Sequence, residues 1–189
     1  MKYFFKDNSY SIFKMFINQL GMTIFGLTLS MATSQNDTLF LITSIFAVCF
    51  YMVLLYCMTW DIGYEEKIRI DAGRLDYNPF KGFFLSLSAN ALNFILAVMI
   101  ISGYYGASSF IEGAPASPEW AVNIFGIGRM AAGLLEAMYG GIINVVFNLS
   151  PWSYLIIPIP AIITCTLAYN AGVKGFRIFP ASKKDQNKE

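Results

Sequence analysis

Apolar residues run along most of this chain in long stretches that short charged segments separate. Four stretches are long enough to cross a bilayer as helices, because about 20 mostly apolar residues span the hydrocarbon core. They lie at 13–32, 39–60, 82–104 and 152–172. Trp and Tyr residues stand near several of their ends, where such side chains prefer the headgroup level. The pattern predicts an all-α integral membrane protein, a single membrane domain over 1–189 with four transmembrane helices.

A fifth stretch, 129–148, is also long enough to span, but it contains Arg129 and Glu136. We therefore expect 105–151 to form an insertion on the outer side of the membrane. Its helical part, 119–148, would re-enter the bilayer or lie at the interface. Small residues recur at every fourth position of this part and favour close helix contacts: Gly133, Ala137 and Gly141.

The basic residues indicate the orientation. Of the 13 Lys and Arg residues, all but Arg129 lie in the N-terminal stretch, in the loop 61–81 or in the tail 173–189. Segments rich in Lys and Arg stay in the cytoplasm. Both termini and the loop should therefore be cytoplasmic, which requires an even number of crossings and agrees with four helices. Short loops and Lys-rich ends suit a bacterial plasma membrane.

Two short motifs recur along the chain. The pattern Tyr-x-x-Phe-Lys-x-Phe begins at Tyr10 and again at Tyr77, at the start of the first and third predicted helices. An aromatic residue, Asp or Asn, an apolar residue and Gly end the second and fourth, at 60–63 and 169–172. These motifs predict two hairpins of the same orientation, a parallel repeat as in some transporters. The alternative is the chance recurrence of residues common at helix ends.

The same repeat indicates whether the first predicted helix, 13–32, is a signal peptide that is cleaved. Ser30-Met31-Ala32 has the small-x-small spacing of a signal-peptide cleavage site. Because 13–32 has a counterpart in the third helix, we expect it to be retained rather than removed.

Composition narrows the function classes. Hydrophobic residues make up 56% of the chain and charged residues 13%, and the mean hydropathy is +0.53. The net charge of +1 lacks the excess of basic residues that is typical of nucleic-acid-binding proteins. The chain has no His, the commonest general base and zinc ligand, and it has no P-loop or Gly-x-Ser-x-Gly. The three cysteines form no Cys-x-x-Cys. We expect no catalytic activity, no cofactor and no metal site.

Polar residues within membrane depth are the candidate functional residues, because each is costly there and needs a partner. They are Glu136, Arg129, Asn90, Asn93 and Asn18. Asn90 and Asn93 are three apart, so they share a helix face. The partner of Glu136 would be Arg129, an Asn of the third helix or a bound cation. The alternative is structural, an ion pair or hydrogen bonds between helices.

Two further features leave alternatives open. Pro158 and Pro160 interrupt the last helix and either kink it or free carbonyls that could coordinate an ion. The loop 61–81 carries four basic and five acidic residues and forms either a short amphipathic helix or a docking surface.

The sequence favours a non-catalytic multi-pass protein, an accessory, anchoring or assembly subunit of a membrane complex. The expected partners are the lipid bilayer and a protein that would bind through 61–81 or 129–148. The alternative is a component of a small-solute or ion transporter or channel, acting as a homo-oligomer or with a partner.

Overall fold

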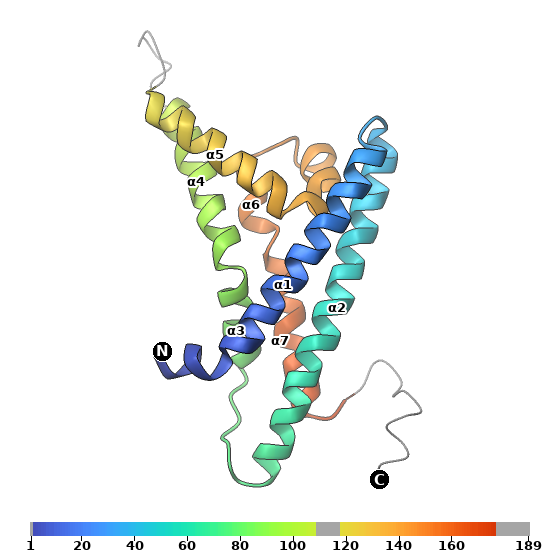
Figure 1. Ribbon diagram of the computed structural model, residues 1–189, viewed down its shortest axis with the longest axis vertical. Helices are drawn as coiled ribbons and strands as arrows, with labels where there is room; N and C mark the ends of the chain where they lie inside the picture. The colour runs from blue at the N-terminus through green and yellow to red at the C-terminus, as the bar shows by residue number, and fades with distance from the viewer. Residues whose placement is uncertain (1, 109–117, 177–189) are drawn as a thin grey trace.

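The computed structural model describes residues 2–108 and 118–176. Every regular element in these ranges is helical (Figure 1). The remaining residues of the predicted insertion and tail, 109–117 and 177–189, lie outside the described residues.

The first two helices form a long antiparallel hairpin. Helix α1 spans Lys2–Thr33 and α2 spans Asp37–Asp71. The Asn36 side chain begins α2 by accepting hydrogen bonds from the N–H groups of Thr38 and Leu39, at 3.1 and 3.2 Å. Helix α2 continues well past residue 60, so the first half of the predicted loop 61–81 extends this helix.

The third predicted span is bent. Helices α3, Lys81–Ala89, and α4, Ala91–Ser108, meet at an angle of 56°. At the break, the Asn90 side-chain amide donates to the Ser86 carbonyl oxygen at 2.9 Å. The Asn90 backbone N–H donates to the same oxygen at 2.9 Å, so the Ser86 carbonyl oxygen accepts two hydrogen bonds where the helix bends.

The second half of the chain returns through several short elements. Helix α5, Glu119–Leu135, runs obliquely back along α4 towards α1 (Figure 1). The 3-10 helix η1, Ala137–Tyr139, and the π-helix η2, Ile142–Val146, pack on α1 and α2. Helices α6, Ser153–Ile156, and α7, Ile159–Val173, follow.

Prolines separate α6 from α7. Pro158 precedes α7, and Pro160 lies in its first turn. The first N–H groups of a helix have no partner within the helix, so proline is tolerated at this position. The interruption predicted from the sequence is therefore a break with a new helix start, and Ser153–Val173 still qualifies as one candidate span.

Three stretches are long and apolar enough to cross a membrane: Asn8–Thr33, Asp37–Asp71 and Ser153–Val173. The bent pair α3–α4 makes a fourth if it counts as one span. Helix α5 is not among them. Large apolar side chains point outwards from these helices, including Ile24, Phe46, Ile95 and Leu167. Soluble monomers rarely expose so much apolar surface, so these features are those of a multi-pass membrane protein.

The two ends of the bundle differ in charge. The first turns of α1, the connection 72–80 and the end of α7 lie together, and we call this the basic end (Figure 1). The described basic residues other than Arg129 belong to it or to the adjoining turns. The opposite end carries the α1–α2 turn and the start of α5, and we call it the α5 end.

Candidate functional site

Glu136 sits where the helical course of the chain changes. Helix α5 ends at Leu135, η1 begins at Ala137, and Glu136 between them has φ −113° and ψ 22°. The Thr23 hydroxyl of α1 donates to the Leu135 carbonyl oxygen at 2.7 Å. This bond ties the end of α5 to α1 and holds Glu136 inside the bundle.

A second contact fixes the segment that follows Glu136. The Gly141 N–H donates to the Ser44 hydroxyl of α2 at 2.8 Å. A Cβ on Gly141 would lie 2.3 Å from the Phe40 carbonyl oxygen, so only glycine allows this approach. By contrast, a Cβ on Gly133, which was predicted to share this packing stripe, would meet nothing within 4 Å. The predicted stripe therefore packs closely at Gly141 but not at Gly133. Helix α5 packs instead on α4, where a Cβ on Gly103 would lie 2.7 Å from the Phe125 backbone nitrogen.

The Glu136 carboxyl group is buried without a partner. Its side chain is 1% exposed, and neither carboxyl oxygen has a hydrogen bond from the described residues. Burying an ionised carboxylate without a partner is very costly, and such a group neutralises instead. Glu136 lies outside the candidate spans, and burial raises its pKa to about 8. The group therefore holds a proton unless a positive charge reaches it.

Arg129 does not supply that charge. It is half-buried on α5, and its guanidinium carbon lies 5.7 Å from the centre of the Phe125 ring. Within residues 2–108 and 118–176 the salt bridge found is that of Lys81 with Glu66. The ion pair of Arg129 with Glu136, one of three options left open by the sequence, is thus not formed.

Two tyrosines lie beside Glu136. The Tyr154 side chain of α6 is 5% exposed, and its hydroxyl is hydrogen-bonded to the Arg129 guanidinium and lies near the Glu136 carboxyl without bonding to it. The Tyr139 hydroxyl of η1 also lies near Glu136. Neither tyrosine was among the site residues predicted from the sequence. Their signal was a phenol in an otherwise apolar segment, which usually needs a polar neighbour when buried.

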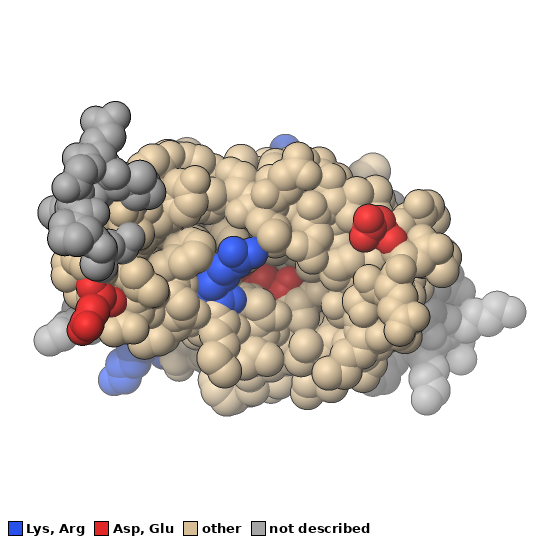
Figure 2. Space-filling view, turned by 90° about the horizontal axis from the view of Figure 1, so that it is seen from above, with Lys and Arg blue, Asp and Glu red and all other residues tan. Residues whose placement is uncertain are grey.

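The surface of the α5 end is hollowed. Figure 2 looks onto the α5 end and shows basic and acidic surface side by side in a hollow near the centre of the face. Uncharged surface surrounds it. The described charged residues in the segments that form this end are Asp37, Glu119, Arg129 and Glu136. Asp37 and Glu119 are exposed at helix starts, whereas Arg129 is half-buried and Glu136 is buried.

The candidate asparagines do not join this site. The Asn93 amide donates to the Asn90 side-chain oxygen at 3.0 Å, and both side chains are buried at the α3–α4 break. Asn18 is half-buried on α1. None of the hydrogen bonds found between described side chains links these three to Glu136. The five candidates thus divide into the pair Arg129 and Glu136, the pair Asn90 and Asn93, and Asn18 alone.

A second polar cluster closes the basic end. Glu66 of α2 forms a salt bridge with Lys81 of α3, and the Tyr169 hydroxyl of α7 donates to its other oxygen at 2.6 Å. The Tyr77 hydroxyl donates to the Asn170 side-chain oxygen. The Asn170 amide in turn donates to the Pro79 carbonyl oxygen at 3.1 Å. These contacts tie three helices and the 72–80 connection together.

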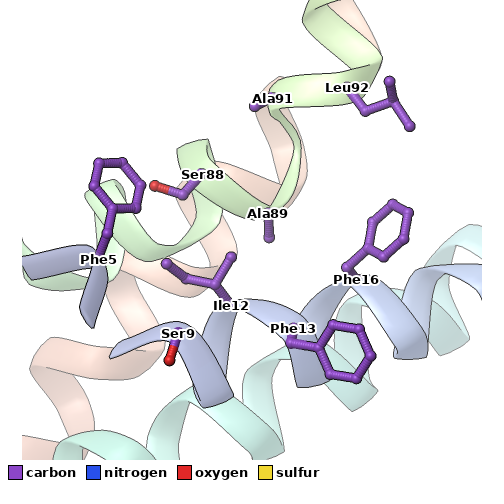
Figure 3. A pocket seen from close by; sticks show the side chains of 9 residues that line it. All are labelled: Phe5, Ser9, Ile12, Phe13, Phe16, Ser88, Ala89, Ala91 and Leu92. Carbon is purple, nitrogen blue, oxygen red and sulfur yellow. The ribbon is translucent and has the colours of Figure 1, made fainter. Parts of the chain in front are cut away.

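An apolar groove lies between α1 and the α3–α4 break (Figure 3). Its volume is about 480 Å³. Side chains of α1 form one wall, including Phe5, Phe13 and Phe16, and Ala89 and Leu92 belong to the other. It has no charged side chain in its lining.

The described residues contain no group of three or more His, Cys, Asp or Glu side chains placed to hold a metal ion. No family model, curated protein or solved structure matches this chain.

Proposed function

We propose that this chain is a non-catalytic multi-pass membrane protein that binds a small positively charged solute at Glu136 as part of a transport process. The observation that supports this best is the Glu136 carboxyl, 1% exposed and without a hydrogen-bond partner among the described residues, in the end of the bundle where a hollow opens. An evolved packing role would normally satisfy such a group, because unpaired buried polar atoms are rare and costly.

The proposed cycle exchanges a proton for a cation. In the empty site Glu136 is neutral, since burial favours the protonated form. An arriving cation displaces the proton, because the carboxylate is then paired. Four spans are few for a complete pathway, so we propose that the protein works as a homo-oligomer or with a partner.

The same proposal includes the arrangement in the membrane. The α5 end faces outwards and the basic end faces the cytoplasm of a bacterial cell, in line with the distribution of Lys and Arg. The two hairpins, α1–α2 and α3–α7, form a parallel repeat. Its support is the mutual contact of the two Gly-ending motifs: Gly63 packs on Tyr169, and Gly172 packs on Trp60.

Cation binding by the purified protein tests the function. Sodium, potassium, ammonium and ethylammonium chloride would be added to the protein in mild detergent, in an amine-free buffer, while its melting temperature is recorded. We expect at least one of these cations to stabilise the wild type and not Glu136→Gln. Glu119→Gln is the matched control, because Glu119 lies at the same end but is exposed. Equal responses of wild type and Glu136→Gln to all four salts would contradict the proposal.

An accessory subunit is the second candidate, and the groove between α1 and α3–α4 favours it. Part of the predicted docking loop is engaged internally, because Glu66, Tyr77 and Lys81 contact α7 or one another. The groove remains open to a partner helix. Ser9→Trp would fill it, and Thr28→Trp is a control on an exposed position of α1. Loss of a co-purifying subunit in Ser9→Trp alone, seen by native mass spectrometry, would support this role; no partner with the wild type would exclude it.

A further inference from the structure

The two charges in the hollow of the α5 end point to the class of solute. Resting on the function proposed above, we infer that this site takes a zwitterion: an ammonium group binds the Glu136 carboxylate, and a carboxylate or phosphate of the same molecule binds the Arg129 guanidinium.

Two residues of opposite charge lie near one another at this site without forming an ion pair. The Tyr154 hydroxyl is hydrogen-bonded to Arg129 and lies near Glu136, yet no salt bridge joins Arg129 and Glu136. A buried ion pair is stable only when its geometry is good and its remaining groups are satisfied. Here Tyr154 lies close to both side chains, and each keeps its capacity for an ionic partner from outside the protein.

The charges of Arg129 and Glu136 also favour a ligand without net charge. With Glu136 ionised, Arg129 and Glu136 together carry no net charge. A simple cation would satisfy Glu136 but bring a positive charge towards Arg129. A simple anion would satisfy Arg129 but approach Glu136. A zwitterion pairs both charges, and at short range in a poorly solvated site each interaction is strong.

The hydrogen-bond donors of Arg129 and Tyr154 also suit such a ligand. A guanidinium presents a planar fork that matches a carboxylate or phosphate with two parallel hydrogen bonds. Because Arg129 is half-buried beside the Phe125 ring, its fork is held on one side by the protein. The Tyr154 hydroxyl can donate or accept in the middle of the ligand. No other described basic residue belongs to α5, η1, η2 or α6.

Two classes of molecule carry this pair of opposite charges. A free amino acid carries an ammonium and a carboxylate, and a phosphatidylethanolamine headgroup carries an ammonium and a phosphate. The inference concerns the shared pair of charges, and the experiment separates the two sources.

Matched probes test the inference on the full-length protein in detergent. Alanine has both charges, ethylammonium keeps only the cation, and propionate keeps only the anion, at nearly the same size. Phosphoethanolamine stands for the headgroup. We expect alanine or phosphoethanolamine to bind at least tenfold more tightly than ethylammonium and propionate, by calorimetry. A preference for phosphoethanolamine, repeated in nanodiscs with and without phosphatidylethanolamine, would identify the lipid source, and a preference for alanine the free solute.

Variants separate this inference from the proposed function. Arg129→Gln should lose the advantage of the zwitterion while still binding ethylammonium, and Glu136→Gln should lose both. Arg129→Lys and Glu136→Asp keep the charges and should retain part of the zwitterion binding if a variant without charge fails to fold. If ethylammonium equals the zwitterions and Arg129→Gln changes nothing, the inference fails and the cation site remains. If no probe binds the wild type, the inference fails, and the proposed function fails with it only when sodium, potassium and ammonium also leave the melting temperature unchanged.

Discussion

Gly63 on α2 and Gly172 on α7 are packed against each other's helix backbone. A Cβ on Gly63 would lie 2.3 Å from the Tyr169 carbonyl oxygen, and a Cβ on Gly172 would lie 2.3 Å from the Trp60 carbonyl oxygen. Each glycine thus meets the aromatic residue that begins the other motif. Such small residues let helices approach closely in membranes, where van der Waals packing drives association.

This contact predicts a large effect of one methyl group. Gly63→Ala or Gly172→Ala would force α2 and α7 apart, and we expect a loss of about 1–3 kcal/mol or more, the usual range for overpacking. Gly21→Ala is the matched control, because a Cβ there meets nothing within 4 Å. It should be neutral or stabilising by up to about 1 kcal/mol, since alanine favours helix. Thermal unfolding in one detergent would measure all three; equal effects at positions 21 and 63 would contradict the contact.

The buried carboxyl predicts a pH-dependent stability. The folded-state pKa of Glu136, about 8, lies above its unfolded value. Both states hold the proton below about pH 4.5, so the wild type has no penalty there. Between about pH 4.5 and 8 the unfolded state ionises while the folded state stays protonated, and stability falls.

Glu136→Gln removes this titration. The melting temperature of the variant should therefore rise relative to that of the wild type as the pH increases from 5 to 8, and then level off. One pKa unit corresponds to about 1.4 kcal/mol, so the difference should reach a few kcal/mol. The buffer must be free of amines, which would occupy the site. A constant difference across this range would show that Glu136 does not keep its proton.

The cluster at the basic end predicts non-additive mutations. Glu66→Met would leave Lys81 without its partner, and Lys81→Met would leave Glu66 with only the Tyr169 hydroxyl. Each single change should cost about 3 kcal/mol, because it strands a largely buried charge. The double variant should recover much of this loss, since no charge then remains unpaired. Glu65→Met, at an exposed neighbour, is the control. Additive losses in denaturant unfolding would rule out this coupling.

The bend at Asn90 predicts a local cost. Asn90→Leu removes the acceptor of the Asn93 amide and the donor to the Ser86 carbonyl oxygen. We expect a loss of about 1–3 kcal/mol from the stranded Asn93 amide. The pair Asn90→Leu with Asn93→Leu should be closer to the wild type in thermal stability. A loss in the pair equal to the sum of the two single losses would count against the shared network.

The membrane orientation can be read by labelling. In a background without Cys49, Cys57 and Cys165, Glu119→Cys and Arg74→Cys would be treated with an impermeant maleimide in intact cells. Both positions are exposed, at opposite ends of the bundle. We expect Glu119→Cys to react at once and Arg74→Cys to react only after permeabilisation. The reverse pattern would invert the proposed orientation.

That the chain forms several long apolar helices, three or four of which could span a membrane, could be predicted from the sequence. The reason is that a stretch of apolar residues long enough to cross a bilayer has few alternatives to a helix, since the backbone must satisfy its own hydrogen bonds there. The sequence also indicated that Glu136 needed a partner, because a carboxylate among apolar residues is costly in any fold. Spacing along one predicted helix suggested Arg129 as its partner, but spacing along the chain could not choose between Arg129, an Asn of the third helix and a bound cation.

The tertiary structure ruled out the ion pair of Glu136 with Arg129. Helix α5 ends at Leu135, so Arg129 and Glu136 are not on one continuous helix and do not pair. Tyr154, from a segment beyond the insertion, comes to lie beside both. Likewise, Glu66 meets Lys81 and Tyr169 only because α2, α3 and α7 pack together. Hydrophobic length determines that helices form, but which polar groups meet depends on the faces that distant helices turn to one another.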